Sequence, residues 1–106
     1  MRKKLKTNGN SWSMYIHKEF SEILGISETN RHVVLVLKKQ TLYLQSLAEN
    51  YKNSQVNFLT KKLIKRGSGY GLIFTLPILE LLQINPEIDW IDIEVNKKTI
   101  KIKKHL

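Results

Sequence analysis

The feature that most constrains the fold is a pattern that occurs twice, with a period of about 58 to 60 residues. Each copy has a polar loop, an alternating segment, a short amphipathic segment and two apolar runs separated by a few polar residues. A copy of roughly 45 residues is too small for a hydrophobic core alone to stabilise it reliably. We therefore predict that the two copies complete each other as an intramolecular pseudo-dimer within one compact domain.

Each copy begins with residues that alternate between polar and apolar. The alternation over residues 12–16 recurs over residues 72–76, and a period of two is typical of a half-buried strand. A glycine-containing loop precedes each strand. Alignment of the two loops pairs Gly9 with Gly69, which is an offset of sixty.

A short helix is predicted to follow each strand. Apolar residues recur three and four positions apart over Lys18–Leu24, and Gly25 ends this helix. The second helix is expected to begin at Pro77, which suits a first helical turn, and to end by residues 84–86. The helix ends align at an offset of 58, so the second helix is expected to be about two residues shorter.

Each copy is predicted to end in a β-hairpin. The first spans residues 33–45 around a turn at 38–40, and the second spans 90–103 around a turn at 96–98. A polar segment without clear periodicity lies between the copies and is interpreted as a linker. The predicted organisation is mostly β with two short helices, and it comprises a first repeat (1–47), a linker (48–57) and a second repeat (58–106).

Charge and composition indicate the class of partner. Eighteen Lys and Arg against nine Asp and Glu give a formal charge of +9, which favours binding to polyanions and places nucleic acid first. The alternative is that the lysines reflect codon bias and only keep the surface hydrated. The sequence has no cysteine and no histidine cluster at ligand spacing, so we expect no metal, no cofactor and no enzymatic activity.

The targeting signals expected of a secreted or membrane protein are missing from the sequence. The basic residues after Met1 are not followed by the apolar segment of a signal peptide, and no apolar run approaches the length that spans a bilayer. We expect a cytoplasmic, nucleoid-associated protein that does not bind membranes.

The order of these motifs resembles a known family. Residues 6–11 (KTNGNS) are similar to a MazE-type loop, and residues 65–71 (KRGSGYG) followed by 75–77 (TLP) are a looser version. With the helix stop at 24–26 (LGI) and the hairpins, they resemble the AbrB/MazE/SpoVT swapped-hairpin transcription factors. The resemblance implies a small AbrB-like barrel with interleaved strands, formed here by one chain, and a basic surface of loops and strands that binds DNA.

The sequence departs from the family pattern at several positions. His17 stands where the family usually has proline, and Gln83 replaces the glycine that ends the second helix. Tyr15 and Thr75 occupy a strand position that a DNA-contacting arginine often fills. These departures put the details of base recognition in doubt.

The residues predicted to contact DNA lie in and near the two loops. The cations are expected to bind phosphates, and Lys6, Arg66 and the loop side chains are expected to reach bases or stack on them. The candidates are Arg2, Lys3, Lys4, Lys6, Asn10, Ser11, Lys61, Lys62, Lys65, Arg66, Ser68 and Tyr70. Ordinary turn chemistry also explains Asn10 and Ser11.

Glycines and tryptophans near the candidates have simpler structural interpretations. Gly67, Gly69 and Gly71 are expected to serve the backbone conformation of the loop. Trp12 is in phase with the apolar face of its strand, and Trp90 begins a hairpin strand, so both are expected to support the core.

The predicted function is a sequence-specific, double-stranded DNA-binding transcriptional regulator. One alternative is an antitoxin that binds a toxin protein and represses its own operon, and another is a scaffold whose basic face binds an acidic protein. The chain ends just after its last predicted strand, without the toxin-binding extension usual in such antitoxins, which favours the regulator, although the linker could serve in place of that extension. The sequence leaves open whether pseudo-dimers associate further.

Overall fold

A computed structural model describes residues 1–8, 11–46 and 58–106. As predicted, the described chain is mostly β with two short helices, and its strands form two antiparallel sheets. The first repeat contributes β1 (Arg2–Lys3), β2 (Lys6–Asn8), β3 (Ser11–Ile16), α1 (Lys18–Leu24), β4 (His32–Lys38) and β5 (Thr41–Ser46). The second contributes β6 (Phe58–Lys62), β7 (Ile64–Arg66), β8 (Gly69–Phe74), α3 (Leu76–Leu82), β9 (Ile91–Asn96) and β10 (Thr99–Lys104).

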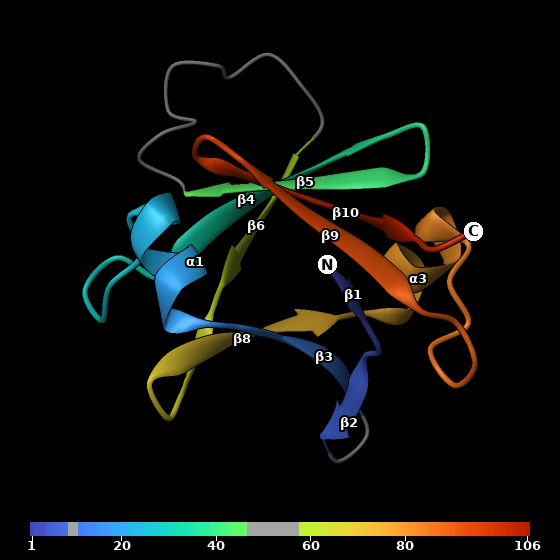
Figure 1. Cartoon of the computed structure of the whole chain (residues 1–106), viewed down its shortest axis with the longest axis horizontal. Coiled ribbons are helices and arrows are strands. Elements are labelled where there is room, and N and C mark those ends of the chain that lie inside the picture. Colours follow the sequence, from blue (N-terminus) through green and yellow to red (C-terminus); the bar gives the residue numbers. More distant parts are fainter. Residues whose placement is uncertain (9–10, 47–57) are drawn as a thin grey trace.

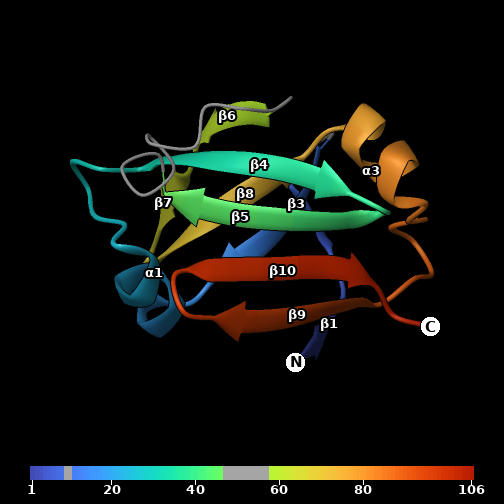
Figure 2. The same ribbon diagram turned by 90° about the horizontal axis from the view of Figure 1, so that it is seen from above.

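Both sheets combine strands from the two repeats (Figure 1). The six-stranded sheet has the order β1-β9-β10-β5-β4-β6, and the four-stranded sheet has the order β2-β3-β8-β7. The first strand of each repeat thus pairs with the hairpin of the other, since β1 lies beside β9 and β6 lies beside β4. Figure 2 shows β4, β5, β10 and β9 of this sheet side by side, with the helices α1 and α3 at opposite ends of the molecule.

The strand pairs formed by one repeat and those formed by the other are related by one constant shift in residue number. Lys3 pairs with Ile91, and Lys61, which is 58 positions after Lys3, pairs with Val33, which is 58 positions before Ile91. In the centre of the four-stranded sheet, Met14 pairs directly with its own equivalent, Leu72. The pairing therefore has an approximate twofold symmetry that relates the two repeats.

The constant shift corrects three details of the sequence alignment. The residue equivalent to Gly69 is Ser11, because β2 and β7 are themselves 58 positions apart, and Gly9, with which the sequence alignment paired Gly69, lies outside the described residues. Tyr15 is equivalent to Ile73 rather than to Thr75. The helices α1 and α3 each have seven residues, so the predicted shortening of the second helix is wrong.

The core lies between the two sheets and takes equivalent residues from both repeats. Leu5 and Leu63 are buried where the chain passes from the six-stranded to the four-stranded sheet. Leu24 and Leu82, in the last turns of the two helices, are also buried in this core. The described strands form two separate sheets rather than the predicted single barrel, since the chain leaves regular pairing at each of these passages.

Both helices end in the same left-handed backbone conformation. Gly25 has φ 76°, and Gln83 has φ 57° at the equivalent position. In each case the backbone N–H of this residue donates to carbonyl groups of the preceding turn. The helix α3 begins at Leu76, one residue before the predicted start, and Pro77 occupies its first turn.

The two hairpins have tight turns of two residues. Lys38 pairs with Thr41 and Asn96 pairs with Thr99, so the predicted three-residue turns are each one residue too long. Lys39 has a positive φ, as the hairpin turns that match the strand twist require.

Some predictions concern residues outside the described parts of the chain. The linker 48–57 and the candidate Asn10 belong to this group. Among the described residues, neither helix has the length and apolar character needed to cross a bilayer.

Candidate nucleic-acid interface

The four-stranded sheet has one face on the core and one face directed away from it. Met14, Ile16 and Leu72 alternate inward along β3 and β8 and belong to the core cluster. Their strand neighbours therefore lie on the opposite face, at the bottom of Figure 1. We call this side the outer face, and its residues are Lys6, Ser11, Ser13, Tyr15, Ile64, Arg66, Gly69, Gly71 and Ile73.

Charges are segregated between this sheet and the rest of the described chain. The four strands β2, β3, β7 and β8 carry Lys6, Lys65 and Arg66 and contain no Asp or Glu. The described acidic residues lie in the helices, in the loops that follow them and in β9. The outer face therefore presents positive charge without a neutralising carboxylate on its own strands, which is the character expected of a polyanion-binding surface.

The first-repeat half of the outer face is polar. Lys6 is exposed on β2 and pairs with Ser13 of β3. Ser13 is buried, and its hydroxyl donates a long hydrogen bond of 3.5 Å to the backbone carbonyl of Lys6, in addition to the backbone pairing of β2 with β3. Ser11 is half-buried at the start of β3 and lies on the same face.

The second-repeat half of the outer face is built on two glycines. A Cβ atom at Gly69 would collide with the backbone oxygen of Ile16 and with the ring of Tyr15, and one at Gly71 would lie 2.9 Å from Nε of Arg66. Tyr15 and Arg66 therefore lie directly over the glycine backbone. Only Gly67 has the positive φ expected of a loop glycine, so the conformational interpretation of Gly69 and Gly71 is wrong.

Three further candidates surround the loop between β7 and β8. Ser68 is exposed in this turn. Lys65 is exposed on the other side of β7, and its Nζ lies 5.1 Å from the centroid of the Tyr70 ring. Tyr70 itself is only 5% exposed and belongs to the core cluster, so its ring is not accessible for stacking on a base. The alternation of β8 explains this position, because Tyr70 is in phase with the buried Leu72.

Lys3 contacts the end of β3 from the neighbouring sheet. Its Nζ donates to the backbone oxygen of Tyr15 over 3.1 Å and lies 3.2 Å from Nε2 of His17. Partial burial, with a smaller contribution from repulsion by Lys6, lowers the pKa of Lys3 from its usual value. Lys3 is thus a positioned cation whose charge an approaching phosphate would stabilise.

Arg2 and Lys4 lie on one flank of the molecule, around Trp90. The guanidinium of Arg2 lies 5.4 Å and the Nζ of Lys4 lies 5.9 Å from the centroid of the Trp90 ring. Lys4 also donates to the backbone oxygen of Glu87. Trp90 is 46% exposed and packs under these cations, so the expectation that it supports the core is wrong, whereas Trp12 packs against the core as predicted.

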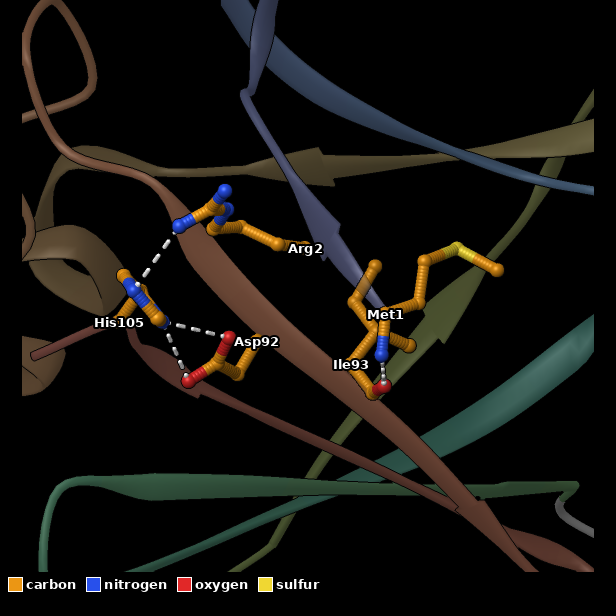
Figure 3. Close-up of polar contacts among 5 residues, drawn as sticks. All are labelled: Met1, Arg2, Asp92, Ile93 and His105. Carbon is orange, nitrogen blue, oxygen red and sulfur yellow. Dashed lines mark hydrogen bonds and ion pairs between the residues drawn. The ribbon is translucent and has the colours of Figure 1, made fainter.

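Arg2 also contacts His105, whose ring in turn contacts Asp92 (Figure 3). Nδ1 of His105 lies 2.9 and 3.0 Å from the two carboxylate oxygens of Asp92, and Nη1 of Arg2 lies 3.2 Å from Nε2. In the neutral tautomer with the proton on Nδ1, His105 donates to Asp92 and accepts from Arg2. Arg2 is therefore engaged within the protein, on the six-stranded sheet.

The remaining predicted cations, Lys61 and Lys62, lie on β6 at the opposite edge of the six-stranded sheet from β1. The structure thus places Lys6 and Ser11 at one end of the outer face and Arg66, with Ser68 in the adjoining turn, at the other end, while the other cations lie along the flanks. The sequence interpretation missed the role of Tyr15. The signal that could have revealed it is the pair of glycines two positions apart in a strand, which indicates close approach of neighbouring groups.

No metal site is evident in the described part of the chain, where no three His, Asp or Glu side chains cluster. Comparison of the chain with models of protein families, with curated proteins and with solved structures finds no match. The functional interpretation therefore depends on the geometry and charge of the outer face.

Proposed function

We propose that this protein is a sequence-specific, double-stranded DNA-binding transcriptional regulator of the AbrB/MazE/SpoVT type, in which one chain forms the swapped-hairpin pseudo-dimer. The observation that carries the proposal is the charge segregation of the four-stranded sheet. Its strands supply three cations and no carboxylate, on both sides of an approximate twofold axis.

The strand exchange supports the pseudo-dimer. Because β1 pairs with β9 and β6 pairs with β4, neither repeat completes its own part of the six-stranded sheet. Two chains make such an exchange in most members that the sequence resembles. A single chain with two repeats makes both halves of the DNA-binding surface at once.

The outer face would bind DNA through two kinds of contact. Lysines on the face and along its flanks would neutralise phosphates and release counterions, which makes the affinity fall with salt. Lys6, Arg66 and the loop side chains would reach base edges. An approximate twofold axis between two basic groups suits a duplex, whose own backbone has twofold symmetry.

The test is binding of the purified protein to duplex fragments upstream of its own gene, measured over a salt series. The double variant Lys6→Ala/Arg66→Ala removes two charges from the outer face. The matched control, Lys101→Ala/Lys103→Ala, removes two charges from β10 of the other sheet. We expect the first variant to lower the salt slope by about two and the control to leave it nearly unchanged.

Two outcomes would contradict the proposal. Equal weakening by both double variants would indicate attraction by net charge alone, without a defined face. A complete lack of binding to any duplex would direct the search to an acidic protein partner, which includes a toxin.

A further inference from the structure

We propose that the two halves of the outer face contact unlike DNA half-sites, so that the sequence bound with highest affinity is not a palindrome. This inference rests on the proposed function and specifies its substrate. It follows from a comparison of equivalent positions, which the constant shift of 58 makes exact to the residue.

Equivalent positions of the core carry the same kind of side chain in both repeats. Met14 is equivalent to Leu72, and Leu5 to Leu63, and all four are buried. The outer face differs from this pattern at each of five equivalent pairs. These pairs are Lys6 and Ile64, Asn8 and Arg66, Ser11 and Gly69, Ser13 and Gly71, and Tyr15 and Ile73. The backbone of the face is therefore symmetric, and its chemistry is not.

The second-repeat half presents an arginine in an apolar setting. Arg66 lies over Gly71 and follows Ile64, which is 44% exposed on the same face of β7, and Ile73 lies further along β8 on this face. Within the described residues, no hydrogen bond or ion pair engages its guanidinium. A guanidinium can donate two parallel hydrogen bonds to guanine, and apolar side chains contact the methyl group of thymine. This half suits a half-site with guanine and thymine at adjacent positions.

The first-repeat half cannot make the same contacts. Its cation is Lys6, an ammonium that acts as a compact charge and has no planar fork. The hydroxyl of the nearby Ser11 can both donate and accept a hydrogen bond, and the equivalent position in the other half is a glycine. Contacts around Lys6 and Ser11 are therefore polar, and the aromatic ring of Tyr15, which belongs to the same repeat, lies away from them over Gly69 of the other repeat.

Gly71 offers a way to disturb Arg66 without removing it. Its φ is not in the left-handed region, so alanine is compatible with the strand backbone. The added Cβ would lie 2.9 Å from Nε and 3.1 Å from Cδ of Arg66, and this flexible side chain would have to move. Ser13→Ala is the matched control, because Ser13 is the equivalent residue of the other half.

The experiment is selection of bound duplexes from a random pool by the full chain, followed by affinity measurements on the selected site. We expect a motif with two different half-sites. Arg66→Lys and Gly71→Ala should relax the preference in one half-site and weaken binding about tenfold or more, and Lys6→Ala should act on the other half-site. Ser13→Ala should leave the half-site changed by Gly71→Ala as selective as in the wild type. Thermal unfolding of each variant confirms that it is folded.

The alternative outcomes separate the two proposals. A palindromic motif, or an equal loss of selectivity in both half-sites on changing Arg66, would overturn this inference and leave the proposed function intact. Failure to select any duplex would overturn the proposed function, and this inference with it.

Discussion

The ends of the two helices make a direct comparison between the repeats. The helix α1 ends at Gly25, and α3 ends at Gln83, yet both residues have a left-handed backbone. This conformation is unfavourable for a residue with a Cβ, so the second repeat accepts a local cost to keep the same helix end. The packing of Leu24 and Leu82 into the core explains why the backbone is retained, because a different helix end would displace a buried leucine.

The flanks of the six-stranded sheet make the opposite comparison. Arg2 pairs with Asp92 in the register, and the equivalent pair on the other side is Thr60 and Val34. Asp92 takes part in the contacts with His105, whereas Val34 is an apolar, buried residue. Equivalent backbone positions thus carry an ionic group on one side and an apolar group on the other. The comparison shows that the repeats share the side chains of the core cluster between the sheets and differ on the opposite face of the six-stranded sheet.

The largest effect is expected when the two equivalent leucines are truncated at the points where the chain passes from one sheet to the other. Leu5→Ala and Leu63→Ala should each lower the free energy of unfolding by about 2 to 5 kcal/mol, because both side chains are buried in the core. Urea unfolding followed by circular dichroism measures both. If one of the two changes has little effect, the repeats do not share the core equally.

A smaller effect is expected at the glycines of the outer face. Gly69→Ala should lower the free energy of unfolding by about 1 to 3 kcal/mol, because the added Cβ would meet the backbone of Ile16, which cannot move aside freely. The equivalent change, Ser11→Ala, should alter it by about 0.5 kcal/mol or less. Equal stability of the two variants in thermal unfolding would contradict the close packing of Tyr15 over Gly69.

The helix ends should respond in opposite directions. Gly25→Ala should destabilise the protein by about 1 to 2 kcal/mol, since it introduces a Cβ at a left-handed position. Gln83→Gly should stabilise it by up to about 1 kcal/mol by removing such a Cβ. Chemical denaturation of both variants checks the signs. Destabilisation by Gln83→Gly would indicate that the Gln83 side chain contributes contacts that outweigh the strain.

The smallest effect concerns the titration of Lys3. Because burial and Lys6 lower its pKa in the folded state, protonated Lys3 opposes folding, and this penalty decreases as the pH rises from the lowered pKa and is gone above the usual pKa of the unfolded state. NMR of ¹³C-methylated lysines should show Lys3 titrating at a lower pH in the folded protein than in urea. Lys6→Ala should reduce the difference only in part, since burial is the larger cause. Identical titration in both states would contradict the burial of this ammonium group.

The candidate site was only partly predictable from the sequence. The loop motifs directed attention to Lys6, Ser11 and Arg66, and these residues lie on the outer face because residues beside an alternating strand have a fixed relation to its faces. The prediction that Tyr70 contacts DNA did not take the alternation of its strand into account. Tyr70 lies on the inner face of β8, and its neighbours Gly69 and Gly71 lie on the outer face. The aromatic and histidine contacts of Arg2 join residues about ninety to a hundred positions apart, and local patterns carry no information about them.

The sequence by itself determined the local elements. Alternation, helical spacing and turn residues predicted the longer strands, both helices and both hairpins, since these signals act over a few neighbouring residues. Only the tertiary structure decided the constant shift of 58, the exchange of β1 and β6 between the repeats and the division into two sheets. These features depend on which strands pair across the whole chain. Such pairing is set by the fit of the buried side chains of both repeats in one core.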